Sequence, residues 1–472
     1  MIKLISKHKQ NENIVYIISK KTQIKKLELS NEEQNYVQKI FENKSDFVHI
    51  NSLSFSKFVI LANEEKEINS RLEILRNLAN KTVNILNELK YTELNILDLS
   101  EKYALEFAEA LSLSTYSFNK YFKNKEEKTI SLKSINIISE KLSEKDIQVK
   151  NALCEGVFVA RDIINEPVSF MTATKLGQEV ESLAKKFGFK AEVFDKGKIE
   201  SLKMGGLLAV NRGSVEPPTF SVLSYEPKNA VNENYIVLVG KGLVFDTGGI
   251  NLKPSGSLET MKSDKSGGAA VIGVISAIAK AKLPIKIIGL LPSTDNRPGN
   301  NAYVPEDIIT MHDGTTVEVM NTDAEGRLIL ADALSYAKKF NPDLVIDIAT
   351  LTGAAVVAIG ESATAVMGNS EKHISELKKT GFEVWERLVE LPLWEDFGEQ
   401  LKSPVADMKN IGTRWGGAIT AGKFLEHFTD YNWVHLDIAG PAFTEKNDSY
   451  RGKGGTGVGV RLIFNYLLKT FE

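Results

Sequence analysis

Three observations predict that this sequence folds as an α/β protein of two domains. Its 472 residues exceed the size of one ordinary domain, since domains usually hold about 100–200 residues. The composition changes near residue 150: Lys, Asn, Glu and Ser are abundant before it, and glycine becomes frequent after it. Short apolar runs alternate with helix-like segments on both sides of that change. We therefore expect a smaller amino-terminal α/β domain at 1–150 and a larger α/β domain at 151–472.

The amino-terminal part contains short runs of β-branched and aliphatic residues that predict strands. These runs are Ile14–Ile18, Phe58–Leu61 and Leu94–Leu99. Between them, Glu67–Leu89 places its aliphatic side chains along one stripe, which predicts an amphipathic helix. Residues 118–135 are charged and read as a solvated loop. A helix from about Ser143 to Asn165 is expected to lead into the second domain.

The second part contains strands that are apolar without alternation. They are expected at Tyr235–Val239, Ile285–Leu291, Leu344–Ile348 and Trp433–Ile438. Such runs are typical of strands buried on both faces of a sheet. Helices are expected at Gly267–Ala281, which is apolar nearly all round and should be central, and at Ala324–Phe340. The prediction is a central mixed sheet flanked by helices.

The composition excludes several classes of protein. The net charge is −3, so no overall basic field attracts nucleic acid or an anionic membrane. Lysines at 20–26 and 120–128 are offset by nearby glutamates, which favours a solvated surface over a DNA contact. No apolar run is long enough to span a membrane. Cys154 is the single cysteine and the amino terminus lacks an apolar signal region, so we expect a cytoplasmic protein without an intramolecular disulfide.

Two charged motifs lie in otherwise apolar sequence, and each is close to a predicted strand. The motifs contain Lys241, Asp246, Lys253 and Asp264 in the first, and Asp323, Glu325 and Arg327 in the second. Ligands bind beyond the carboxyl ends of strands in open α/β sheets. Carboxylates are rarely buried unless they are paired or bound to metal. The constellation therefore predicts a hydrolase that uses two metal ions.

The residue types restrict the metal chemistry. Carboxylate ligands suit Mg²⁺ and Mn²⁺, and also Zn²⁺ where the geometry is enforced. No histidine lies in either motif. Lys241 could ligate only as a neutral amine, and burial beside a cation would lower its pKa toward that form. The alternative for Asp323 and Glu325 alone is an acidic first turn of a helix, but two such motifs together favour a metal site.

At several stretches the sequence resembles the leucyl aminopeptidase family (cytosol aminopeptidase, M17). The stretches are Val239–Pro254, Asn321–Leu328, Arg161–Pro167, Thr350–Gly353 and His435–Gly440. The resemblance covers about 155–472. It departs at Lys265, where the family commonly has methionine, and slightly at 413–420. Lys265 is expected either to lie beside the substrate pocket or to point to solvent.

The resemblance implies a set of site residues. The implied metal ligands are Lys241, Asp246, Asp264, Asp323 and Glu325, with Asp246 and Glu325 bridging both ions. Lys253 would polarise the scissile carbonyl. Arg327 would hold a bicarbonate, helped by the backbone near Lys253, Gly326 and Leu351. Asp264 would also bind the substrate's α-amine, and the first side-chain pocket would include Met261, Thr350 and Gly353.

The resemblance also implies cofactors, substrates and assembly. The metal ions would be Mn²⁺ or Zn²⁺, with Mg²⁺ as a further candidate, and the substrates would be peptides. The protein would be a homohexamer whose amino-terminal domain serves assembly or regulation.

The prediction is thus a metalloaminopeptidase that prefers leucine or other neutral residues. One alternative is a DNA-binding hexamer, and a weaker one is a di-metal phosphoesterase, whose usual Asp-x-His elements are missing here.

Overall fold

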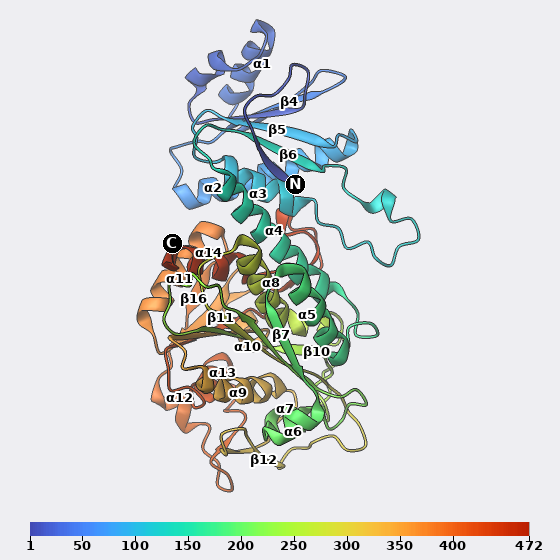
Figure 1. The fold of residues 1–472 in the computed structure, drawn as a ribbon, viewed down its shortest axis with the longest axis vertical. Coiled ribbons are helices and arrows are strands. Elements are labelled where there is room, and N and C mark those ends of the chain that lie inside the picture. Colours follow the sequence, from blue (N-terminus) through green and yellow to red (C-terminus); the bar gives the residue numbers. More distant parts are fainter. Residues whose placement is uncertain (472) are drawn as a thin grey trace. The chain divides into compact units, whose positions relative to one another are not determined.

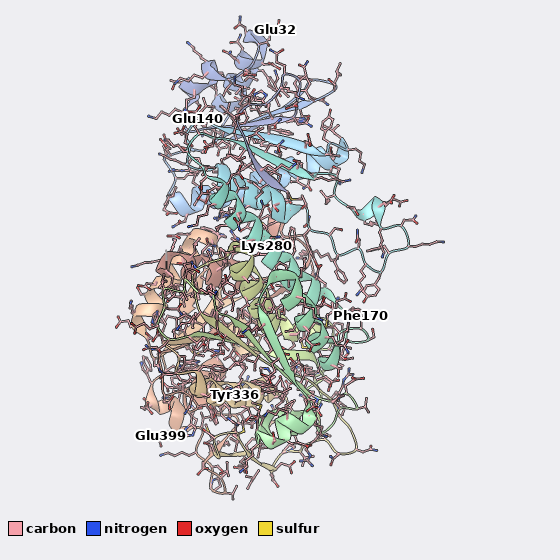
Figure 2. All side chains as sticks on the ribbon, in the orientation of Figure 1. Glu32, Glu140, Phe170, Lys280, Tyr336 and Glu399 are labelled. Atoms are coloured by element: carbon pink, nitrogen blue, oxygen red, sulfur yellow. The ribbon has the colours of Figure 1, made fainter. Side chains whose placement is uncertain are left out.

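The computed structural model describes residues 1–471, which form two compact units (Figures 1 and 2). The first unit is Met1–Cys154 together with Lys446–Gly452. The second is Glu155–Glu445 and the rest of the described chain from Lys453. The roles predicted for two domains, assembly or regulation for one and catalysis for the other, remain predictions.

The first unit is built on a six-stranded sheet in the order β1-β6-β5-β2-β4-β3. All neighbouring strands are parallel except β3 and β4. Strand β2 is buried along its whole length, because its five residues are all apolar and it lies inside the sheet. The elements are β1 (Ile2–Ile5), β2 (Ile14–Ile18), α1 (Asn31–Glu42), β3 (Phe47–Asn51), β4 (Ser56–Leu61), α2 (Ile68–Glu88), β5 (Glu93–Asp98), α3 (Ala104–Ser114) and β6 (Ser134–Ile138), followed by α4 (Glu144–Asn165).

The second unit is built on a mixed sheet in the order β16-β15-β18-β14-β9-β11-β8-β7, with β10 paired to β11. Its central strands β18, β14, β9 and β11 are mutually parallel, and β8, β7 and β15 introduce antiparallel pairs. The strands are β7 (Lys190–Phe194), β8 (Thr219–Tyr225), β9 (Ile236–Gly240), β10 (Gly242–Asp246), β11 (Ile287–Asn296), β14 (Leu344–Ala349), β15 (Thr364–Gly368), β16 (Leu388–Glu390) and β18 (Trp433–Asp437). Two small sheets contain β12 (Ile308–Thr310), β13 (Thr316–Glu318) and β17 (Met408–Lys409), and β19 (Phe443–Thr444) and β20 (Gly454–Gly455).

Helices cover both faces of this sheet (Figure 1). One layer contains α5, α8, α11 and α14, and the other contains α7, α9 and α13. Helix α8 is buried over nearly its whole length, as predicted. Gly273 of α8 allows this helix to pack closely against α4. A Cβ at this position would lie 2.5 Å from the carbonyl oxygen of Gly156 on α4. The helices are α5 (Ala173–Phe187), α6 (Lys196–Ser201), α7 (Gly205–Asn211), α8 (Ser266–Ala281), α9 (Glu325–Ala337), α10 (Gly353–Ile359), α11 (Glu371–Val384), α12 (Glu395–Glu399), α13 (Gly417–Glu426) and α14 (Val460–Phe471).

The predicted mixed α/β architecture is confirmed. Each predicted strand and helix corresponds to an observed element, with ends that differ by a few residues. The largest difference is at β11, which continues to Asn296 rather than ending at Leu291. Among residues 1–471, no helix is long and apolar enough to cross a membrane.

A fully buried histidine–aspartate pair lies in the centre of the sheet of the second unit. His435 on β18 places its Nδ1 2.6 Å from Oδ1 of Asp347 on β14, and both side chains have no exposed surface. Trp433 donates its Nε1–H to the other oxygen of Asp347 at 2.7 Å. Burial alone would lower the pKa of His435, but the neighbouring Asp347 outweighs burial and raises it. Asp347 therefore favours the protonated form of His435.

Replacing Asp347 with Asn should destabilise the protein and flatten the dependence of its stability on pH. Removing one partner of a buried pair costs about 3–5 kcal/mol. Because the pKa of His435 is raised on folding, the stabilisation is fully present below the unfolded value of about 6.5 and is lost as pH rises through the folded value. Urea unfolding of both proteins at several pH values tests this. If the free energy of unfolding changed with pH in the same way for the wild type and for Asp347→Asn, this prediction would be wrong.

Candidate active site

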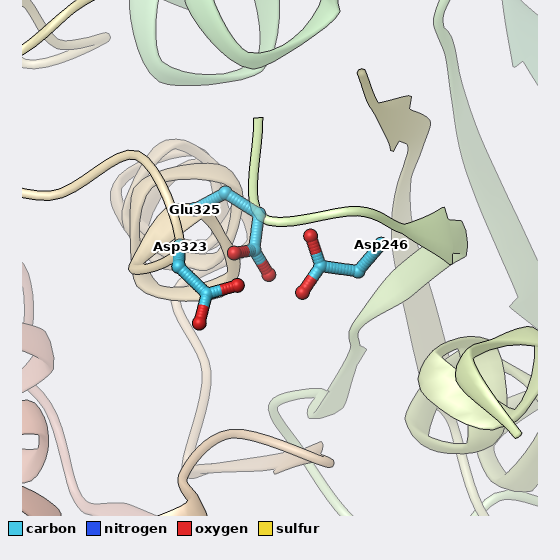
Figure 3. Close-up of side chains that lie close together, drawn as sticks. All are labelled: Asp246, Asp323 and Glu325. Atoms are coloured by element: carbon cyan, nitrogen blue, oxygen red, sulfur yellow. The ribbon is translucent and has the colours of Figure 1, made fainter. Parts of the chain in front are cut away.

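Three carboxylates converge where β10 ends and α9 begins (Figure 3). Asp246 is the last residue of β10, Glu325 is the first residue of α9, and Asp323 lies in the turn before that helix. One oxygen atom from each lies within 4.8 Å of the others. Burial, and then the charge of Asp246, raises the pKa of Glu325 to about 8. The same two causes raise the pKa of Asp323. Such a cluster requires positive charge to be stable.

Two lysines from the first motif provide positive charge within the protein. Lys253 Nζ lies 2.7 Å from Asp246 and 2.6 Å from Asp323. Lys241 Nζ lies 2.8 Å from Asp264 and 2.9 Å from Glu325. All five predicted metal ligands are thus brought together, although Asp264 lies beyond Lys241 and outside the three-carboxylate cluster.

The carboxylates around Lys241 determine its pKa in the protein alone. Burial alone would lower the pKa of Lys241, but Asp264, Glu325 and Asp246 outweigh burial and raise it. Lys241 is therefore an ammonium among these carboxylates. It would have to release its proton in order to coordinate a metal ion.

The residues fit a divalent metal ion. Oε2 of Glu325 is buried and has no hydrogen-bond partner within residues 1–471. Asp246 is oriented, since its Oδ1 accepts hydrogen bonds from the Gly248 amide at 2.8 Å and from Asn296 Nδ2 at 2.9 Å. Clustered carboxylate oxygens are the ligands preferred by hard divalent cations.

The two motifs are fastened together by neutral hydrogen bonds. The main-chain N–H of Asn251 donates to Thr322 Oγ1 at 2.9 Å. The main-chain N–H of Thr322 donates in return to the side-chain oxygen Oδ1 of Asn251 at 2.8 Å. Thr322 Oγ1 also donates to the carbonyl of Gly248 at 2.6 Å. Gly248 and Gly249 have φ values of 86° and 68°, a left-handed conformation that favours glycine. This turn leads the chain from Asp246 back to Lys253.

Arg327 is buried beside the cluster on α9. It donates through Nη1 to the carbonyl of Asn410 at 2.7 Å, while its Nε has no hydrogen-bond partner among the described residues. Burial lowers the pKa of Arg327 to about 10, against the opposing charges of Glu325 and Asp437. A buried cationic N–H without a partner fits an anion such as bicarbonate.

The expected partners of Arg327 in anion binding lie close to Lys241. A Cβ on Gly326 would be 2.6 Å from Lys241 Cε and 3.1 Å from Leu351 Cδ1. The Leu351 amide, however, already donates to Asp437 Oδ1 at 3.0 Å. This amide would have to leave Asp437 or share its hydrogen in order to contact a bicarbonate.

The predicted substrate residues lie around Asp264. Thr350 donates its hydroxyl to Asp264 Oδ1 at 2.7 Å, and its carbonyl accepts from Lys241 Nζ at 3.0 Å. Met261 is half-buried at the start of the 3₁₀ helix η3 (Met261–Lys265), which also carries Asp264. Gly353 is exposed at the first position of α10.

Sequence reasoning missed several polar residues that hold these groups. The side chain of Asn410 accepts a hydrogen bond from the main-chain N–H of Met320 at 2.7 Å and donates one to the carbonyl of Asn321 at 2.7 Å. Its main-chain carbonyl accepts a hydrogen bond from Arg327. Asp437 accepts the Leu351 amide and the Thr352 hydroxyl, the latter at 2.7 Å. Neither stands at a diagnostic spacing from a motif, and only the stretch His435–Gly440 drew attention to Asp437.

Lys265 does not point to solvent, so that part of the expectation is wrong. Its side chain is completely buried. Burial, together with the charge of Lys262, lowers the pKa of Lys265 to about 7.

Comparison with known proteins supplies the family. The model of the cytosol aminopeptidase family, catalytic domain, matches residues 158–464, which hold every residue of the site. The chain belongs to the cytosol aminopeptidase family.

Relatives and solved structures agree with that assignment. The chain is 42% identical to "Probable cytosol aminopeptidase" of Sulfurihydrogenibium sp. (strain YO3AOP1), over 92% of this chain and 88% of the relative. It is 40% identical to that of Clostridium perfringens (strain 13 / Type A), over 98% of both chains. A mutant of tomato leucine aminopeptidase superposes with a TM-score of 0.86 at 27% identity, covering 99% of this chain and 96% of that one. The bottromycin maturation enzyme BotP in complex with Mn superposes with a TM-score of 0.86 at 28% identity, covering 98% and 100%.

The predicted activity is confirmed: this family member is a metal-dependent aminopeptidase that acts on peptides. The family depends on a pair of metal ions, as the sequence predicted. Neither the DNA-binding alternative nor the phosphoesterase alternative receives support from the comparisons.

In this aminopeptidase, Gly326→Ala should lower activity without destabilising the helix. The new Cβ would meet Lys241 Cε at 2.6 Å and Nζ at 2.8 Å, so it would displace the end of that lysine. Misplacement of a catalytic group by about 1 Å can reduce turnover about a hundredfold. Alanine itself favours a helix over glycine by about 1 kcal/mol. The measurements are kcat/KM with leucyl amide and the thermal midpoint.

The matched control is Gly197→Ala on α6, where a Cβ meets only Asp195 Oδ1 at 3.5 Å. We expect this variant to retain wild-type kcat/KM. Full activity in Gly326→Ala as well would show that close packing against Lys241 is not needed for catalysis.

Proposed function

We propose that this aminopeptidase removes leucine and other neutral amino-terminal residues from peptides in the cytoplasm. The observation that carries the proposal is the cluster of Asp246, Asp323 and Glu325, flanked by Lys241 and Lys253. Two divalent ions, Mn²⁺ or Zn²⁺ with Mg²⁺ as a further candidate, would be held by Lys241, Asp246, Asp264, Asp323 and Glu325. When bound, such ions lower the pKa of water and polarise a carbonyl.

The protein's own groups divide the remaining tasks. Lys253 is a fixed cation at the partly exposed edge of the cluster, where it can stabilise negative charge that develops on the scissile carbonyl oxygen. Asp264, hydrogen-bonded by Thr350 Oγ1, presents a buried carboxylate to the substrate's free α-amine. Arg327, with the backbone of Gly326 and Leu351, would hold a bicarbonate, which when bound supplies a proton acceptor.

Specificity and assembly follow from the same proposal. Met261, Thr350 and Gly353 would line the pocket for the first side chain, and the flexible thioether of Met261 suits leucine-like groups. The resemblance to the family implies a homohexamer, and Trp415 and Val357 of the second unit are exposed apolar side chains that an interface could cover. Sedimentation as a monomer would contradict the hexamer. The first unit would serve assembly or regulation.

The decisive experiment compares leucyl amide with N-acetyl-leucyl amide in the presence of Mn²⁺. Only leucyl amide should be hydrolysed, because acetylation removes the charge that Asp264 would bind. Chelation should abolish the hydrolysis, and added Mn²⁺ should restore it. Equal hydrolysis of both amides would contradict the role of Asp264, and hydrolysis that survives chelation would contradict the metal mechanism.

Lys253→Met should lower kcat with a smaller change in KM. The substitution removes the cation that would stabilise the developing oxyanion, an effect worth about 10²–10³ in kcat. Steady-state kinetics with leucyl amide at saturating Mn²⁺ measure it, and circular dichroism confirms that the variant is folded. An unchanged kcat would remove Lys253 from the mechanism.

A further inference from the structure

Lys265 is buried next to a proposed metal ligand, yet within residues 1–471 its hydrogen-bond acceptors are main-chain carbonyls and not carboxylates. It stands between Asp264 and the first residue of α8, and its side chain has no exposed surface. Its Nζ donates to two main-chain carbonyls, that of Glu166 at 3.0 Å and that of Lys262 at 2.6 Å. A lysine in such a place costs desolvation energy, so its retention requires an explanation.

The carbonyl of Glu166 belongs to the end of helix α4. The last four carbonyls of an α-helix have no partner within the helix, and cationic side chains are favourable near that end. Lys262 Nζ donates to the carbonyl of Asn165 at 3.0 Å, and Lys265 Nζ donates to the next carbonyl along the chain. Two lysines of η3 thus hold this short segment against the end of α4.

The position of η3 matters because it carries Met261 and Asp264. The segment has five residues, and 3₁₀ turns of this length have weak internal hydrogen bonds. Contacts to the rest of the protein must therefore fix it. On one side Asp264 is held by Lys241 and Thr350. On the other side Lys262 and Lys265 hold it, and of the two Lys265 is the fully buried one.

We propose that Lys265 is a positioning residue that sets the place of Asp264, and thereby the affinity for the substrate's α-amine and for metal. The inference rests on the proposed function of Asp264. It needs no particular protonation state, since both the ammonium and the neutral amine carry the two N–H groups that the two carbonyls accept. It also gives η3 an internal polar support.

The test is Lys265→Met, which keeps the length of the side chain and removes both hydrogen bonds. KM for leucyl amide should rise about tenfold, the scale of a lost hydrogen bond to a charged group. The Mn²⁺ concentration for half-maximal activity should rise with it. The change in kcat should be smaller, because Lys253 and Arg327 are carried by other segments.

The matched control is Lys423→Met on α13. Lys423 is also buried and donates to Glu395 at 2.8 Å, but it is not part of the site. We expect this variant to lose thermal stability while KM and the Mn²⁺ requirement stay at wild-type values. The comparison separates positioning from a general loss of stability.

Wild-type KM and Mn²⁺ requirement in folded Lys265→Met would overturn the inference, whatever happens to its thermal midpoint. If Lys265→Met does not fold, Lys265→Gln replaces it, because the amide retains N–H donors and should give an intermediate KM. Failure of both variants to fold would also overturn it, since Lys265 would then serve folding rather than positioning. Absence of wild-type activity on leucyl amide would instead overturn the proposed function.

Discussion

The structure of the site depends on two lysines, each inserted between two carboxylates. Lys253 joins Asp246 to Asp323, and Lys241 joins Asp264 to Glu325. Four carboxylates against two ammonium groups leave an excess of two negative charges if all six groups are ionised. Burial, and then the charge of Asp246, raise the pKa of Glu325 in this setting. Divalent cations would offset this excess, so the same imbalance that would destabilise an ordinary core suits a metal site.

The surrounding framework is made of neutral groups and of glycine. Asn251 and Thr322 exchange hydrogen bonds between the two motifs, and Asn296 orients Asp246. Because amides and hydroxyls fix these positions without adding charge, the balance between the lysines and carboxylates is left undisturbed. Gly326 contributes by lacking a side chain where Lys241 must lie. The charged groups supply the chemistry and the neutral groups supply the geometry.

The sequence predicted the parts of this arrangement that leave a periodic or compositional signal. Strands such as Leu344–Ala349 are apolar throughout because both faces are covered, and the charged motifs stand out against them. The contacts between distant segments left no such signal. Asn410 and Asp437 are ordinary polar residues whose partners lie more than eighty positions away in the chain. The pKa of Lys241 in the protein alone likewise depends on how many carboxylates the fold brings around it, which spacing alone does not reveal.

The segment Lys446–Gly452 has a consequence for any attempt to divide the chain. It belongs to the first unit, where Tyr450 and Arg451 donate to the buried carboxylate of Glu73 at 2.9 Å and 2.8 Å. A fragment that ends at Cys154 would keep Glu73 but lose both donors, leaving an acidic group in an apolar interior with less compensation. The amino-terminal fold is therefore completed by a segment that follows most of the second unit in the chain. The two units are thus not interchangeable modules that recombination could exchange at a single junction.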